Sequence, residues 1–207
     1  QAALGALVAL GKGDKAAIAE LGELDARTPG LPRGAFDAGT LALVRDRHDE
    51  GPLARLFATL ADPLAEAIGP SLGSLSVGRR ERVDKKSGHA VRAEIVAWAE
   101  ALGIPEIEVY VGGADPHGIR GVPAEVPALV VGSAVRAPFS ADDRQTVVRE
   151  LFALRRGTTA ARSRDASTLA AVVAAACRLA ELPTDVASES LAVDVHRSLG
   201  KAISRKT

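Results

Sequence analysis

The sequence has little of several residue types, and each shortage excludes a class of protein. A single cysteine, Cys177, excludes an internal disulfide and suits a reducing compartment, so we expect a cytoplasmic protein. No apolar run approaches the ~20 residues that span a bilayer, and no secretory signal pattern is present. Lys and Arg together number 26, as do Asp and Glu, so no net field recruits nucleic acid or an anionic membrane.

Methionine is absent, and aromatic residues make up only 3% of the chain. The lack of methionine predicts that residue 1 is not a native start and that the chain is the tail of a longer protein. Since aromatics are few, Ala, Leu and Val must supply the core. The 207 residues are 47% hydrophobic and 25% charged, which is ordinary globular material for one domain and an appendage.

The N-terminal quarter is predicted to be a helical appendage. Residues 2–26 favour a helical hairpin around the turn GKGD, which resembles the last helix pair of a tetratricopeptide-repeat (TPR) array. A generic amphipathic hairpin is an equal alternative. Repeats are stabilised by stacking on neighbours, so the hairpin must pack on the following domain or on further repeats. A Pro/Gly-rich connector follows at 28–39. We therefore divide the chain into an appendage with its connector, 1–50, and a domain, 51–207.

The domain is predicted to be α+β and mostly α-helical. A small sheet of two to four strands is expected to pack on the helix 140–157. Trp98 is expected to anchor the core, and Cys177 to be a small core residue. The basic stretch 78–86 lacks interleaved aromatics and is expected to be a solvated loop. Apolar periodicity places helices at 40–47, 53–61 with a continuation past Asp62-Pro63, 89–103, 169–182 and 186–203, and strands at 107–111 and 128–131.

The helix 140–157 has the sequence SADDRQTVVRELFALRRG. Ser140 is its expected N-cap, and Gly157 its expected end. The stretch RELFA lies where a zinc-peptidase helix carries H-E-x-x-H, in which two histidines bind the metal and the glutamate activates water. Arg149 and Ala153 occupy the ligand positions, and neither can bind zinc. Only Glu150 remains, and taken alone a helix glutamate is a solvated charge.

The surrounding order of elements resembles a known family. LGIPEIEVYV, the loop GGADPHGIRGVPAEV, PALVVGS and the RELFA helix together resemble the segment before and through the active helix of gluzincin metallopeptidases of the CAAX-prenyl-protease and heat-shock membrane-peptidase kind. The stretch is also similar to the C-terminal portion of long bacterial TPR proteins, where this helix keeps R-E-L without the histidines. The resemblance implies a zincin-like fold that has lost its metal ligands.

The possible cleft of such a domain comprises His117, Arg149, Glu150 and Arg156. We expect no metal and no cofactor. In these peptidases the third zinc ligand is a glutamate on a later helix, next to small residues and an aspartate. The glutamates in that region, Glu181 and Glu189, do not lie in such a sequence. The histidines are scattered, and no two of them form an H-x-x-x-H pair: they are His48, His89, His117 and His196.

A helical wheel of residues 140–157 separates its arginines into two groups. Arg149 and Ala153 share the face opposite the apolar stripe, with Arg156. Arg144 and Arg155 project into the stripe, so their stems snorkel to water or their guanidinium groups meet buried acids. If Arg149 lies in the cleft, it is expected to bridge to an acid and lock the cavity shut.

Three functions are compatible with the sequence. The favoured one is a non-catalytic pseudo-peptidase domain that serves assembly or protein-partner binding at the end of a TPR-type protein, its partner being another protein or upstream repeats. The first alternative is a peptide-binding TPR adaptor whose groove lies on the hairpin. The second is a hydrolase with an unconventional metal site involving Glu150 and His117.

Overall fold

The computed structural model describes residues 8, 11–26, 31–32, 34–43, 51–185 and 188–205. The chain divides into two compact units, Gln1–Pro32 and Arg33–Thr207. In the first unit, helix α2 (Lys15–Ala26) begins where Asp14 Oδ1 accepts a hydrogen bond from the Ala17 amide at 2.7 Å. Only Val8 is described from the first arm of the predicted hairpin, so most of that arm lies outside the described residues.

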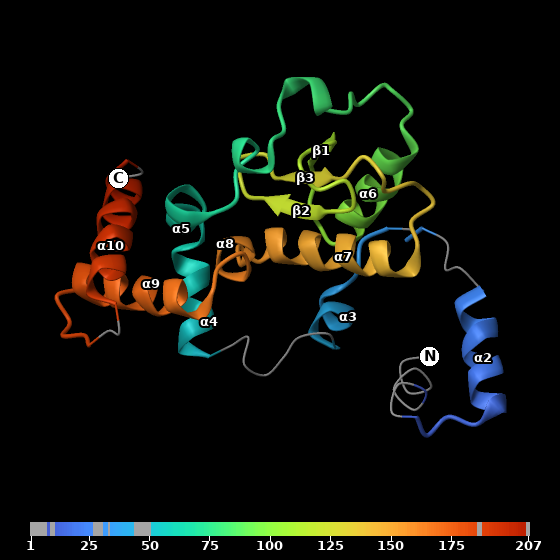
Figure 1. Cartoon of the computed structure of the whole chain (residues 1–207), viewed down its shortest axis with the longest axis horizontal. Coiled ribbons are helices and arrows are strands. Elements are labelled where there is room, and N and C mark those ends of the chain that lie inside the picture. Colours follow the sequence, from blue (N-terminus) through green and yellow to red (C-terminus); the bar gives the residue numbers. More distant parts are fainter. Residues whose placement is uncertain are drawn as a thin grey trace. The chain divides into compact units, whose positions relative to one another are not determined.

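The second unit contains a small sheet and most of the helices (Figure 1). Among its described residues the helices are α3 (Ala38–Leu43), α4 (Pro52–Thr59), α5 (Ala61–Ile68), α6 (Ala90–Ala101), α7 (Ala141–Arg155), α8 (Thr159–Arg162), α9 (Ala166–Leu179) and α10 (Glu189–Ser204). Two 3₁₀ turns, η2 (Gly73–Leu75) and η3 (Arg79–Glu81), precede α6. The strands are β1 (Glu108–Val111), β2 (Ile119–Val122) and β3 (Ala128–Val131).

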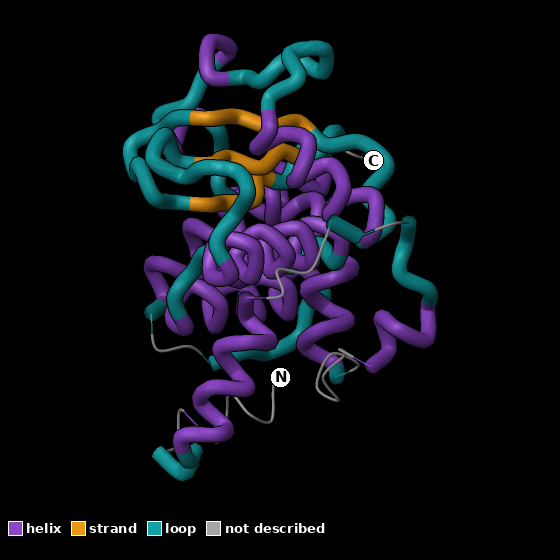
Figure 2. Tube along the Cα trace, turned by 90° about the vertical axis from the view of Figure 1, so that its right-hand side faces the viewer, coloured by secondary structure: helices purple, strands orange, loops and turns teal. Residues whose placement is uncertain are grey.

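The sheet has the order β1-β3-β2, with the strands labelled in Figure 1 and drawn in orange in Figure 2. β1 runs parallel to β3 with Val109 opposite Leu129, and β2 runs antiparallel to β3 with Gly121 also opposite Leu129. The sequence predicted β1 and β3 and assigned all of β2 to a loop, which is wrong. Because β3 is central and covered on both faces, it is apolar at every position, as expected for a strand without a solvated side.

Alternate residues of the strands pack into different clusters on the two faces of the sheet. Val109, Leu129 and Val131 belong to the main core, where α6 and α7 cover the sheet. Tyr110 and Val130 point to the other face and pack with residues of the segment before α6. This alternation is the period-2 pattern of a strand. α7 therefore lies against one defined face of the sheet, with β2 as its nearest strand.

A separate apolar cluster joins α5, α8, α9 and α10. Leu64, Val172 and Leu199 are fully buried in it. α9 is rich in alanine at its contact with α10, which lets the two helices pack closely. Its buried members are all alanine, valine or leucine, as the low aromatic content of the chain predicts.

Several helix boundaries differ from the predictions for local reasons. α9 begins three residues earlier than expected, because Asp165 caps it by accepting a hydrogen bond from the Thr168 amide at 2.7 Å. The break between α4 and α5 lies at Leu60, before Asp62-Pro63, so the proline occupies the first turn of α5. α10 begins at Glu189, and positions 44–47 and 186–187 of two predicted helices lie outside the described residues.

The observed fold class is α+β, mostly helical, with one small sheet, which confirms the coarse prediction. The stretch 78–86 is an exposed loop with one 3₁₀ turn, as expected, and Arg82 forms an isolated bridge to Tyr110 of the edge strand β1. Trp98 is half-buried against the main core. None of the described helices is long and apolar enough to cross a membrane.

Candidate functional site

α7 carries the RELFA residues, on which the resemblance to the metallopeptidase helix depends. Ser140 caps it, since its Oγ accepts a hydrogen bond from the Asp143 amide at 3.1 Å. Glu150 is buried where α7 meets β2, and Ala153 is also buried, whereas Arg149 is exposed. Two expectations are therefore wrong: Glu150 is not a solvated charge, and Ala153 does not share an outer face with Arg149.

Both carboxylate oxygens of Glu150 are already engaged. Oε2 accepts a hydrogen bond from the Gly121 amide at 2.9 Å, and Oε1 lies 3.2 Å from Nη2 of Arg162. Nη1 of Arg162 also donates to the carbonyl of Arg149 at 3.1 Å. We call these three groups, Glu150, Gly121 and Arg162, the Glu150 clamp. It joins the middle of α7 to the edge strand β2 and to α8.

The clamp closes the outer edge of the sheet. Because β2 is an edge strand, the N–H and C=O groups of alternate residues point away from β3 and need other partners. Gly121 donates its outward N–H to Glu150, and the outward carbonyl of Ile119 accepts from the Arg120 guanidinium at 3.2 Å. A Cβ on Gly121 would lie 3.0 Å from Leu154 Cγ, so the glycine allows α7 to approach the strand closely. Side chains thus occupy two outward polar groups of the edge strand.

The remaining predicted cleft residues do not gather around Glu150. His117 is exposed in the loop before β2, where its amide donates to Asp115 Oδ1 at 3.0 Å. Arg156, the C-cap of α7, places its guanidinium 5.8 Å from the centre of the Phe152 ring. Within the described part of the chain no carboxylate pairs with Arg149, so the expected Arg149 lock is wrong.

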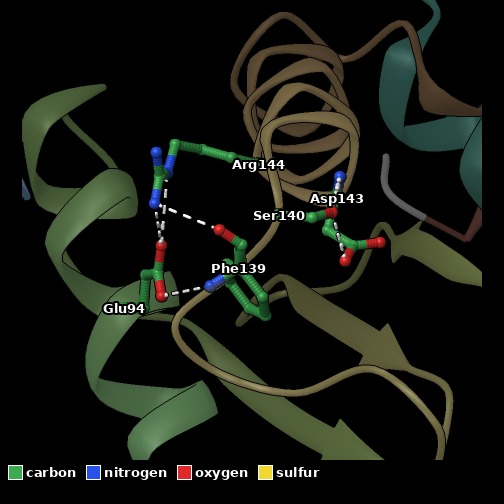
Figure 3. A network of polar contacts seen from close by, with 5 residues as sticks. All are labelled: Glu94, Phe139, Ser140, Asp143 and Arg144. Atoms are coloured by element: carbon green, nitrogen blue, oxygen red, sulfur yellow. Dashed lines mark hydrogen bonds and ion pairs between the residues drawn. The ribbon is translucent and has the colours of Figure 1, made fainter. Parts of the chain in front are cut away.

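A second buried glutamate forms a similar arrangement that the sequence reasoning missed (Figure 3). Oε2 of Glu94 on α6 accepts a hydrogen bond from the Phe139 amide at 3.0 Å, and Oε1 lies 3.3 Å from the Arg144 guanidinium. Nη2 of Arg144 also donates to the Phe139 carbonyl at 3.2 Å. We call Glu94, Phe139 and Arg144 the Glu94 clamp. Of the two alternatives predicted for Arg144, snorkelling to water or meeting a buried acid, the structure shows the second.

A signal for Glu94 was present in the sequence. Val91, Ile95 and Trp98 form the apolar stripe of the helix at i, i+4 and i+7, and Glu94 lies between them at i+3. A carboxylate at a core position needs a partner, because an unpaired buried charge is costly. Pairing this position with Arg144, which projects into the stripe of its own helix, would have predicted the clamp.

The donor chemistry around Glu150 does not fit a zinc ion. Arg149 and Ala153 flank Glu150 at the spacing at which an H-E-x-x-H helix would carry its histidines, and a guanidinium or a methyl group offers no lone pair to a metal. Among the described residues, no three or more His, Cys, Asp or Glu side chains come together as a metal site requires. His48 lies outside those residues.

Comparisons with known proteins assign no family: no family model, no curated protein and no solved structure matches this chain.

Proposed function

We propose that this chain contributes a non-catalytic domain that serves assembly or the binding of a protein partner, on the scaffold of a degenerate gluzincin-like metallopeptidase. The observation that carries the proposal is the engagement of Glu150. A general base must have a free oxygen within hydrogen-bond reach of the water or group whose proton it takes. Here one oxygen accepts from the Gly121 amide and the other pairs with Arg162, in a side chain that is buried.

The order of elements also supports the proposed ancestry. α6, which ends at Ala101, is followed by β1, β3 and the RELFA helix α7, in the order that the resemblance implies, with β2 inserted in the expected loop. On this proposal the carboxylate that remains at the former catalytic position has become a structural clamp. It holds together α7, the edge of the sheet and α8, which preserves the scaffold without the metal ligands.

The first unit supports a role in assembly. The side chains described along α2 are mostly exposed, and Ile18 is 53% exposed. A repeat helix of this kind is stabilised by stacking on neighbouring repeats or on a partner. We propose that α2 meets such a neighbour, either further helical repeats or another protein.

The direct test compares the wild-type chain with Glu150→Gln, using metal content after purification and hydrolysis of an unfolded protein substrate with added zinc. We expect no stoichiometric zinc in either protein, no hydrolysis above a buffer control, and a loss of stability in the variant. Stoichiometric zinc together with hydrolysis that Glu150→Gln abolishes would overturn the proposal and support the unconventional hydrolase. Gln145→Ala, an exposed position on the same helix, is the matched control.

A further inference from the structure

A pocket of about 720 Å³ lies next to the Glu150 clamp in the second unit. Its walls come from α5, from the connection between β2 and β3, and from the junction of α7 and α8. Leu154, which approaches Gly121 of the clamp, forms part of one wall. The volume falls within the ~300–1,000 Å³ that is typical of ligand pockets in proteins.

The pocket combines a small apolar floor with acidic groups. Its apolar lining residues are Ala61, Ala65, Pro123, Pro127, Leu154 and Ala160. Alanines and prolines have little or no rotamer freedom, so a ligand that packs on them orders few side chains. The charged lining residues are Asp62, Glu66 and Glu125, and none of the described lining residues is basic.

The three acids differ in what they already bind. Glu66 pairs with the guanidinium of Arg205 at the end of α10, so this rim already holds one cation of the chain itself. Asp62 takes part in an interaction within the chain as well. Glu125 is exposed in the β2–β3 connection, and no hydrogen bond or ion pair of its carboxylate is present in the described part of the chain. Glu125 is therefore the acid available to a new cation.

The arginines near the pocket each have a partner within the chain. Arg205 is bound to Glu66, and Arg162 belongs to the Glu150 clamp. Arg156 lies over the Phe152 ring. Arg205 offsets the charge of Glu66 at its own part of the rim, whereas Glu125 on the β2–β3 side has no such partner in the described part of the chain.

We propose that this pocket binds an arginine or lysine side chain presented by a segment of a protein partner. The aliphatic stem would lie on the alanine and proline floor, and the cationic head would reach Glu125 at the rim. Charge complementarity selects this occupant, since the Glu125 carboxylate attracts a cationic head and repels an acidic segment. The inference rests on the proposed function, because it names the chemistry of the partner of a non-catalytic domain.

Amide chemical shifts of the full 207-residue chain provide the test, with the peptide acetyl-Ala-Arg-Ala-amide as the probe. We expect saturable shifts at Ala65, Ala124, Glu125 and Ala160 that weaken with added salt. The neutral twin with Gln in place of Arg should bind about tenfold more weakly, because the charge-assisted hydrogen bond is lost. An acidic twin with Glu should not bind.

Variants then assign the site. Glu125→Lys should abolish the saturable shifts and Glu125→Gln should weaken binding about tenfold. Glu100→Lys, an exposed position on α6 that makes the same charge change away from the pocket, should leave binding unchanged. Both positions are exposed, so the variants are expected to fold.

Several outcomes would overturn the inference. The first is an absence of saturable shifts, and the second is equal binding of the Arg and Gln peptides. The third is that Glu100→Lys weakens peptide binding as much as Glu125→Lys does. The fourth is that these amides shift when the protein concentration alone is raised, which would identify a second copy of the chain as the occupant. None of them bears on the Glu150 clamp or on hydrolysis, so the proposed function would stand if the pocket inference failed.

Discussion

The two clamps of the second unit use the same parts in different surroundings. In each, a buried glutamate accepts one backbone N–H and pairs with one arginine that also donates to a backbone carbonyl. In the Glu94 clamp the side chains of both charged partners are well covered, with 12% of Arg144 and 5% of Glu94 exposed. In the Glu150 clamp Arg162 is 37% exposed, against 8% for Glu150.

This difference in exposure indicates which clamp contributes more to the stability of the fold. The Glu94 clamp ties the start of α7 to α6 inside the main core, where an unpaired charge cannot reach water (Figure 3). The Glu150 clamp lies nearer the surface, so water can replace part of what its arginine provides. Buried pairs are costly to break on one side, whereas exposed pairs contribute little. We therefore expect the two clamps to respond differently to the same substitutions.

The largest effect is expected from Glu94→Ala. It leaves the Arg144 guanidinium without its acid and the Phe139 amide without its acceptor in the core, which should lower the free energy of unfolding by about 3–5 kcal/mol. Urea denaturation at pH 7 measures it. Glu100→Ala, an exposed position on the same helix, is the control and should change stability by no more than about 0.5 kcal/mol. A loss below that of Glu150→Ala would reverse the order of the two clamps.

Glu150→Ala should have the second-largest effect. It leaves the buried Gly121 amide without an acceptor, at a cost of about 1–3 kcal/mol, while Arg162 can turn toward water. Glu150→Gln should cost less than the alanine variant, because an amide oxygen can still accept from Gly121. The same urea measurements check both variants. If Gln and Ala were equally destabilising, the Gly121 hydrogen bond would not be the main contribution of Glu150.

Arg162→Ala should have a smaller effect, of about 1 kcal/mol or less, because its side chain is already partly hydrated. A double-mutant cycle with Glu150→Ala measures the coupling of the pair directly. Arg149→Ala is the matched control, since this exposed arginine contributes only its backbone carbonyl to the contact. A coupling energy as large as that of Glu94 with Arg144 would show that exposure does not separate the two clamps.

The sequence predicted the parts of this fold that carry a long periodic signal. α6 and α7 were placed within about two residues, since both have an apolar stripe and a glycine after the last turn. β2 was missed because its four residues, IRGV, contain an arginine and a glycine and follow the turn-forming run ADPHG. Its strand conformation depends on pairing with β3, which is a tertiary contact that no local pattern announces.

The position of Glu150 along its helix could be predicted from the sequence, but its burial and its partners could not. The sequence placed Glu150 in the middle of α7, but its burial depends on how that helix lies against β2. Its partner Arg162 comes from α8, which the α7–α8 connection brings back through Gly157, a residue with φ +67°. Such a turn favours glycine and sets the direction of the next helix. The pairing therefore required the three-dimensional structure.

An exposed carboxylate should contribute less to stability than the buried glutamates of the two clamps, and Asp165 provides such a case. The hydrogen bond from the Thr168 amide, followed by that from the Ser167 hydroxyl, lowers the pKa of this N-cap carboxyl from its ordinary value of 3.8. A lowered pKa in the folded state means that the charged form stabilises the protein above the unfolded-state pKa, and that this contribution is lost as pH falls through the folded-state pKa.

Asp165→Asn keeps a capping oxygen without the charge. The difference in melting temperature between the two proteins should therefore be small and constant above about pH 5, and should shrink as pH falls below about 4. Thermal melts from pH 2.5 to 7 measure it, and a difference that stays constant to the lowest pH would show that the cap acts through its hydrogen bonds alone, without a contribution from charge.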